Sequence, residues 1–270
     1  MAARRTAVLN NRGGVGKSDM AVRLGAALAK RGRRVGILDF DPQGNASRRC
    51  GWRYDEEKPQ LTVSEAVMAN RVGTMAQVWT PVEWNIEYAS RMTLAPAWLE
   101  LENRMAEAGV VGNHLRLAKA LQGADDHLDE VLMDCPPSLF HLTQMVLAAA
   151  HQALIVTEPE IDSILGAKRV RDFVAEKKAT LHNDELVLAG VVVNNLDPAG
   201  KALEREQLGS IRRIFGDLVW DPVVHRRAAL ATADNQAIPL ELTKASGAAP
   251  ARATFELLAE TYEKRSVTVA

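Results

Sequence analysis

The stretch from Asn10 to Ser18 reads Asn-Asn-Arg-Gly-Gly-Val-Gly-Lys-Ser and follows the apolar run from Thr6 to Leu9. A short strand that breaks into glycines and restarts as a helix is typical of phosphate-binding loops. Glycines without side chains let the backbone adopt positive φ, so that its N–H groups converge on a phosphate. Lys17 adds a positive charge for the β and γ phosphates, and the Ser18 hydroxyl is a potential Mg²⁺ ligand. A plain glycine-rich turn with an incidental lysine is the alternative.

The run from Arg12 to Ser18 resembles the deviant Walker A box of the ParA and MinD family, whose pattern is K-G-G-x-G-K-[ST]. Six of its seven positions match, and Asn11 stands where an ordinary P-loop has its first glycine. The resemblance implies ATP binding by Gly13, Gly14, Val15, Gly16, Lys17, Ser18 and Asp19.

Two residues depart from the family pattern. Arg12 replaces the signature lysine, which in the family reaches across a nucleotide-sandwich dimer to the partner's phosphates. Arginine keeps the charge and can bind phosphate in a bidentate manner, but it is longer and planar. Asp19 stands where partition ATPases usually have threonine, and its carboxylate favours a helix N-terminus but repels a nearby phosphate. The matching positions of the box predict ATP binding, and these two differences leave the hydrolysis rate and activation in trans open.

Aspartates follow two apolar, strand-like runs. The run from Val35 to Phe40 contains Asp39 and leads to Asp41-Pro-Gln-Gly-Asn45, which resembles the D-P-Q-G-N segment of ParA-type ATPases. The run from Val131 to Met133 ends in Asp134-Cys-Pro-Pro-Ser138, which resembles the family's Walker B strand and the loop after it. The resemblance implies that Asp41 orients the attacking water with support from Asp39. Mg²⁺ is then expected beside Ser18, Asp41 and Asp134, whereas an isolated Asp-Pro-Gln-Gly run is more often a turn.

Three such boxes in order predict one doubly wound α/β domain over residues 1–270, with a P-loop NTPase fold. We expect a mainly parallel sheet flanked by helices, with nucleotide at the carboxyl ends of its strands. Between residues 79 and 108 the pattern predicts strand segments at Ile86 to Ala89 and Met92 to Ala95, followed by a helix from Leu99 to Ala108. The tryptophans of this region favour structural packing over a partner surface.

Asn194 and Asn195 follow a further predicted strand, Leu186 to Val193. By the resemblance this loop lies beside adenine, and the two side-chain amides are candidates to bind the base, although turn formation explains them equally well. Asp221-Pro222 resembles an Ile-Pro turn that borders the nucleotide in ParA proteins, so Pro222 is also a candidate contact.

Charge and composition argue against a globally basic nucleic-acid-binding protein, a cysteine metal site and a membrane span. The chain has 270 residues, 47% of them hydrophobic, and a formal net charge of −1, so nucleic-acid binding would require a local basic patch. Cys50 and Cys135 fit no metal-ligand spacing, which agrees with a reducing cytoplasm. No leader-like core and no run of about 18 apolar residues appears, and we expect an unprocessed protein without a membrane span.

Basic residues concentrate late in the chain. Such a cluster favours sequence-independent binding to DNA phosphates, and a solvated helix face paired with Glu204 and Glu206 is the alternative. The expected DNA-binding residues are Arg212, Arg213, Arg226 and Arg227, with Lys201, Arg205 and His225 nearby.

The resemblance implies a cytoplasmic, nucleoid-associated partition ATPase that binds ATP with Mg²⁺ and forms a homodimer with ATP. It also implies that this ATPase binds nonspecific DNA and is stimulated by a ParB-like partner to segregate plasmid or chromosome DNA. One alternative is a MinD-like positioning ATPase, which requires a basic amphipathic tail, whereas Ser266 to Ala270 is neutral and short. The other is a weakly hydrolysing, nucleotide-dependent scaffold, which Arg12 and Asp19 favour.

Overall fold

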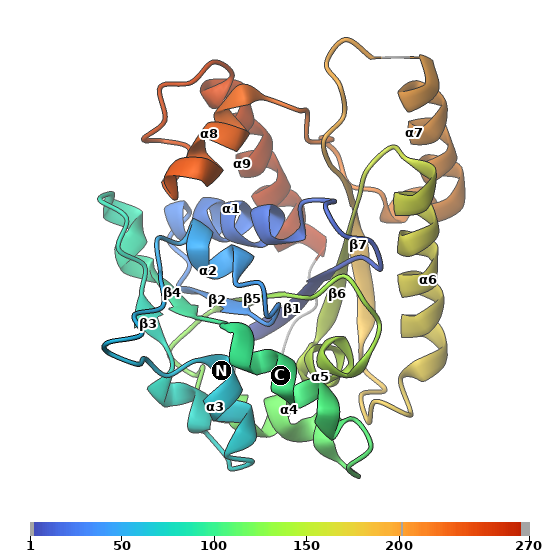
Figure 1. Ribbon diagram of the computed structural model, residues 1–270. Helices are drawn as coiled ribbons and strands as arrows, with labels where there is room; N and C mark the ends of the chain where they lie inside the picture. The colour runs from blue at the N-terminus through green and yellow to red at the C-terminus, as the bar shows by residue number, and fades with distance from the viewer. Residues whose placement is uncertain (1–2, 201, 266–270) are drawn as a thin grey trace.

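The chain folds around a central β-sheet (Figure 1). The computed structural model describes residues 3–200 and 202–265, so Lys201 and the tail Ser266 to Ala270 lie outside the described residues. Within these ranges seven strands form one sheet in the order β3-β4-β2-β5-β1-β6-β7. Only the β3–β4 pair is antiparallel, so the predicted mainly parallel sheet is confirmed. The strands are β1 (Arg4–Leu9), β2 (Val35–Asp39), β3 (Thr80–Pro81), β4 (Met92–Ala95), β5 (Glu130–Asp134), β6 (Gln152–Thr157) and β7 (Val187–Val193).

Helices cover both faces of this sheet. In Figure 1, α1, α8 and α9 lie on one face, α4 and α5 lie on the other, and α6 and α7 flank β6 and β7. Among the described residues, no helix is long and apolar enough to cross a membrane. The α-helices are α1 (Lys17–Lys30), α2 (Asn45–Arg49), α3 (Val63–Met68), α4 (Arg116–Leu121), α5 (His141–Ala149), α6 (Ile161–Lys177), α7 (Ala202–Phe215), α8 (Ala228–Gln236) and α9 (Ala248–Arg265). Short 3-10 helices span Thr74–Gln77, Glu87–Arg91, Leu99–Glu107, Asn113–Leu115 and Gly216–Leu218.

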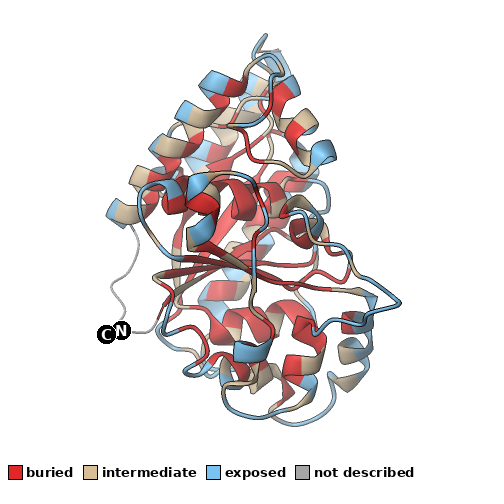
Figure 2. Cartoon of the chain, turned by 90° about the vertical axis from the view of Figure 1, so that its left-hand side faces the viewer, coloured by how far each residue is buried: buried red, intermediate tan, exposed pale blue. Residues whose placement is uncertain are grey.

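The central strands are buried on both faces because their side chains alternate between two apolar cores. Val8 belongs to the core beneath α1 and α9, and its neighbour Leu9 belongs to the core beneath α5 and α6. Figure 2 shows the sheet as a buried layer between helices whose outer surfaces are exposed. This double burial explains why the strands read as continuous apolar runs.

The register brings the chemically important strand ends together. Strand β5 pairs with both β1 and β2, and Asp39 lies opposite Asp134 across the β2–β5 pair. Because all three strands run parallel, the loop after β1 emerges at the same edge as both aspartates. The sheet therefore forms the floor of one site at its carboxyl edge.

The region from residue 79 to 108 differs from the prediction in one respect. The predicted strand from Ile86 to Ala89 is wrong, because Glu87–Arg91 forms 3-10 turns in which the Ala89 amide donates to the Ile86 carbonyl at 3.1 Å. The strand at Met92 to Ala95 is confirmed, and the helix predicted to start at Leu99 consists of 3-10 turns. Trp84 packs in the core, as expected, with its indole N–H donated to the Ala237 carbonyl.

Candidate functional site

The glycine-rich loop joins β1 to α1 and lines a cavity of about 340 Å³. Gly14 and Gly16 have φ values of 80° and 85°, which side-chain-bearing residues rarely adopt. The loop therefore turns its backbone around the N-terminus of α1, where free N–H groups favour anions. The cavity is lined by Gly13, Gly14, Gly16, Lys17, Ser18, Asp19, Asp41, Gln43, Asn45, Arg49 and Pro137.

Lys17 and Ser18 begin α1 at the floor of this cavity. The Lys17 side chain folds back over the loop, and its Nζ donates to the Arg12 carbonyl at 3.3 Å. The residue is only 7% exposed, so its ammonium group lies at the cavity and is shielded from bulk solvent. A positive charge and converging amides at one point suit the oxygens of a polyphosphate.

Asp39 and Asp41 occupy the end of β2 and the loop after it. The Asp39 carboxylate accepts hydrogen bonds from the Ser47 amide at 2.7 Å, the Ser47 hydroxyl at 2.8 Å and the Asp41 amide at 3.1 Å. Burial raises the pKa of Asp39 to about 6. Asp41 Oδ1 accepts from the Gln43 amide at 3.0 Å, and its Oδ2 accepts no hydrogen bond within the described residues. Asp39 thus fixes the loop that presents Asp41 to the cavity.

Asp134 ends β5 and is fully buried. Neither of its carboxylate oxygens has a hydrogen-bond partner in the part of the chain that the structure describes. Burial, followed by the field of Asp39, raises the pKa of Asp134 well above its usual value, and Ser18 and Lys17 oppose that rise. A buried carboxylate without partners is costly, and a nearby cation relieves that cost.

These residues fit a bound Mg²⁺. The described residues contain no group of three or more His, Cys, Asp or Glu side chains placed to hold a metal ion. Mg²⁺ commonly keeps several waters and takes one or two protein oxygens together with substrate phosphates. The Ser18 hydroxyl, with Asp41 and Asp134 reached through water, would supply that donor set.

The residues predicted near adenine fall in two places. The Asn194 side chain lies against the glycine loop, where its Nδ2 donates to the Val15 carbonyl at 3.0 Å. A Cβ on Gly16 would meet Asn194 Nδ2 at 2.2 Å, so this position requires glycine for close packing as well as for φ. Asn195 Nδ2 donates to Glu158 Oε1 at 3.0 Å.

Pro222 does not line the phosphate cavity. It lies in an open groove between α7 and α9, with Arg212, Asp221 and Lys264 among its neighbours. The chain two residues later reaches the carboxyl edge, where the Leu196 amide donates to the Val224 carbonyl.

Arg12 and Asp19 have opposite environments. The Arg12 side chain is exposed and makes no hydrogen bond or ion pair within residues 3–200 and 202–265. Burial raises the pKa of Glu158, and the hydrogen bond from Asn195 and the charges of Arg226 and Arg12 oppose that rise. Asp19 is only 8% exposed and forms an ion pair with Arg23 one helical turn later.

The four arginines predicted to bind DNA do not form one patch. Arg212 is ion-paired with Asp221 at 2.8 Å on the α7 side, and Arg213 donates to Ser210. Arg226 is exposed at the carboxyl edge, where its Nε donates to Asn195 Oδ1 at 3.0 Å. The Arg227 stem lies against Gly247.

Four cavity residues were not among the predicted site residues: Gln43, Asn45, Arg49 and Pro137. Three of them lie inside the two aspartate-proline segments already recognised in the sequence, so the signal for them was present. Arg49 lies at the end of α2, outside any motif, and only the fold brings it to the cavity.

Comparisons with known proteins agree with this geometry. A family profile described as "AAA domain" (AAA_31) matches residues 3–188. The chromosome-partitioning ATPase Soj of Thermus thermophilus is 33% identical over 231 residues, which cover 85% of this chain and 84% of Soj. A complex of Cyanothece McdA with ATP superposes with a TM-score of 0.84 at 19% identity, covering 100% of this chain and 99% of that one, and supports the fold alone. Cobyrinic acid a,c-diamide synthase from Mycobacterium smegmatis, solved with ADP and magnesium, has a TM-score of 0.76 at 27% identity and covers 99% of each chain.

Proposed function

The chain belongs to the ParA/Soj family of P-loop ATPases, and from that premise we propose that it is a partition ATPase that binds ATP with Mg²⁺ and hydrolyses it. The observation that carries the proposal is that Lys17 and Ser18 line the cavity and also act on the buried Asp134 carboxylate, whose oxygens have no hydrogen-bond partner among the described residues. Such a carboxylate beside a lysine and a glycine loop at a helix N-terminus fits both halves of a magnesium–nucleotide complex.

The position of each residue around the cavity indicates its chemical role. The loop amides and Lys17 would bind the phosphates, and Ser18 with the two carboxylates would hold Mg²⁺, whose charge would offset that of the phosphates. Asp41 has a free carboxylate oxygen at the cavity and orients the attacking water. Asp39 acts as a positioning residue, since it accepts one hydrogen bond from the Asp41 amide and two from Ser47 of α2, at the two ends of this loop.

ATP-dependent dimerisation is part of this proposal. Arg12 is exposed beside the cavity and makes no ion pair within the described residues, so its guanidinium is available to the phosphates of a second copy. An arginine there would stabilise charge on the transferring phosphoryl group, as an arginine finger does. Sedimentation with Mg²⁺ and ATP should show a dimer for the natural chain and a monomer for Arg12→Ala. A dimer that is equally stable without the Arg12 side chain would contradict this role.

We assign nonspecific DNA binding first to Arg226, because it is exposed at the same edge as the nucleotide cavity. The ATP-bound dimer would associate with the nucleoid and be released by a ParB-like partner. Arg226→Glu should weaken ATP-dependent DNA binding and lower the salt slope by about one unit. Arg34→Glu, at the opposite edge of the sheet, is the matched control. An unchanged slope for Arg226→Glu would remove this residue from the DNA-binding surface.

A weakly hydrolysing scaffold is the second candidate, and the exchange of lysine for arginine at position 12 favours it. Turnover of the natural chain and of Arg12→Lys, measured with and without DNA and a partner, separates the two. A working Arg12 predicts that the lysine variant is no faster. A severalfold faster lysine variant would support the scaffold.

A further inference from the structure

Asp19 places a carboxylate at the wall of the cavity where the phosphates of ATP would lie. It belongs to the first turn of α1, directly after Ser18, and is 8% exposed. A negative charge at short range and low exposure raises the energy of a bound polyphosphate. Nucleotide binding by this chain therefore requires compensating positive charge.

Four buried or partly buried charges form an alternating cluster at this wall. Arg23 contacts Asp19 on one side and donates to Asp234 Oδ1 at 2.7 Å on the other. Arg23 also donates to the Leu230 carbonyl at 2.8 Å, which fixes it against α8. The second Asp234 oxygen, Oδ2, lies 3.1 Å from the Arg49 guanidinium. The exposed fractions of these side chains lie between 7% and 21%.

Arg49 is the cation of this cluster that lines the phosphate cavity, where Lys17 is the other cationic lining residue among those described. One guanidinium NH group donates to the Asn45 carbonyl at 3.0 Å and the other faces Asp234. Its Nε is buried without a hydrogen-bond partner in the described residues. The planar guanidinium carries five N–H donors, so it can contact Asp234 and an anion at the same time.

The lining charges show why a second cation is needed. Lys17 and Arg49 contribute two positive charges, and Asp19 and Asp41 contribute two negative ones. Without Arg49 the wall would be net negative, which opposes an anionic ligand.

We infer that Arg49 binds a phosphate group of the nucleotide, while Arg23 neutralises Asp19 and Asp234 acts as a positioning residue that holds both arginines. This inference rests on the proposed function, because it assumes that the cavity holds a nucleotide. It also gives Asp19 a place in the site, since the carboxylate is balanced by Arg23 of the same helix and by Arg49 of α2.

The test is a calorimetric titration of Mg²⁺ and the slowly hydrolysed analogue ATPγS into the natural chain and five variants. Arg49→Gln should bind at least about tenfold more weakly than the natural chain, because it loses one charge-assisted contact in a partly buried site. Arg49→Lys should recover part of the loss. Arg48→Gln is the matched control, since Arg48 is the exposed neighbour, donates a hydrogen bond to the Asp234 carbonyl and does not line the cavity. It should stay within about twofold of the natural chain.

Arg49→Gln binding within about threefold of the natural chain would overturn the inference while leaving the nucleotide site intact. A natural chain that fails to bind ATPγS, or that binds no better than Lys17→Ala, would instead refute the proposed function. A double variant that combines Asp19→Asn with Arg49→Gln distinguishes a loss of affinity caused by charge from one caused by altered folding. Removing the anion that Arg49 balances should return part of the affinity, and a double variant as weak as Arg49→Gln would overturn the electrostatic role.

Discussion

Replacing Glu130 by glutamine should destabilise the fold without changing nucleotide affinity. Glu130 is the first residue of β5 and is fully buried. Its carboxylate accepts from Arg4 Nε at 3.0 Å, from Arg33 at 3.2 Å and from the Tyr262 hydroxyl at 2.9 Å. Through Tyr262, Arg4 and Glu130, these bonds connect α9 to β1 and β5 at the amino edge of the sheet, opposite the cavity.

The expected loss is about 3 kcal/mol in the free energy of unfolding. Removing one partner of a buried ion pair typically costs about 3–5 kcal/mol, because the other charge is left buried. The Arg4 side chain is 13% exposed and bears most of this penalty, whereas Arg33 is 41% exposed and can turn to water. Glutamine can still accept the Tyr262 hydrogen bond, which places the loss at the lower end of the range.

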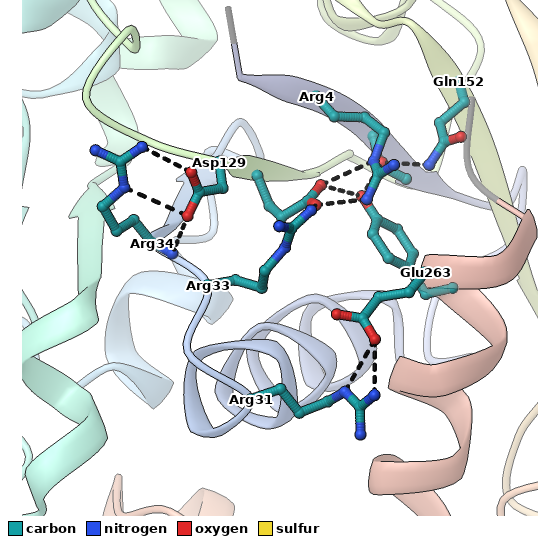
Figure 3. Close-up of polar contacts among 10 residues, drawn as sticks. Arg4, Arg31, Arg33, Arg34, Asp129, Gln152 and Glu263 are labelled. Carbon is teal, nitrogen blue, oxygen red and sulfur yellow. Dashed lines mark hydrogen bonds and ion pairs between the residues drawn. The ribbon is translucent and has the colours of Figure 1, made fainter. Parts of the chain in front are cut away.

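The adjacent Asp129 provides a matched control, because it is also paired with an arginine but lies at the surface. Figure 3 shows Asp129 hydrogen-bonded to Arg34, while Arg4 lies on β1, the strand that pairs with β5. The Asp129 and Arg34 side chains are 27% and 54% exposed, so Asp129→Asn should cost about 1 kcal/mol or less. Equilibrium urea unfolding measures both variants, and nucleotide titration checks that affinity is unchanged. Equal losses for Glu130→Gln and Asp129→Asn would refute the argument from burial.

Three further predictions follow from particular contacts. Gly190→Ala should cost about 1–3 kcal/mol in urea unfolding, because the new Cβ would lie 1.9 Å from Trp220 Nε1 and displace a buried indole; an unchanged midpoint would show that the indole moves freely. Burial and Arg5 lower the pKa of His151 below its usual value of 6.5, so its stabilising contribution is present above about pH 6.5 and is lost as the pH falls through its pKa in the folded state. His151→Gln should therefore flatten the fall in unfolding free energy between about pH 7 and 5, and parallel curves would contradict this. Asp41→Ala should retain ATP binding but stop turnover and trap the dimer in sedimentation, and a monomer with ATP would argue against a sandwich mechanism.

The fold and the floor of the site were predictable because their signals are local in sequence. The glycine loop and the strand ends at Asp41 and Asp134 each carry their own pattern. Parallel strands necessarily bring those ends to one edge. The doubly wound sheet followed from the same residues.

What the sequence did not predict depends on contacts between distant segments. Asp19 appeared as an isolated departure from the family, because Asp234, which completes its charge cluster, lies more than two hundred residues away. The late arginines appeared as one basic cluster, yet Arg212 pairs with Asp221 beside α7, and the fold places Arg226 at the carboxyl edge of the sheet. Local composition cannot separate such residues, because their separation depends on how the segment from Val219 to His225 runs along β7.

Phosphate release from Mg²⁺-ATP by the purified chain, with DNA present, tests the central claim most directly. Lys17 is the ammonium held at the cavity by the glycine loop, so Lys17→Ala should remove both nucleotide binding and turnover. The account predicts steady phosphate release by the natural chain and background release by Lys17→Ala. Equal release by the two chains would contradict the assignment of this cavity as the site of ATP hydrolysis.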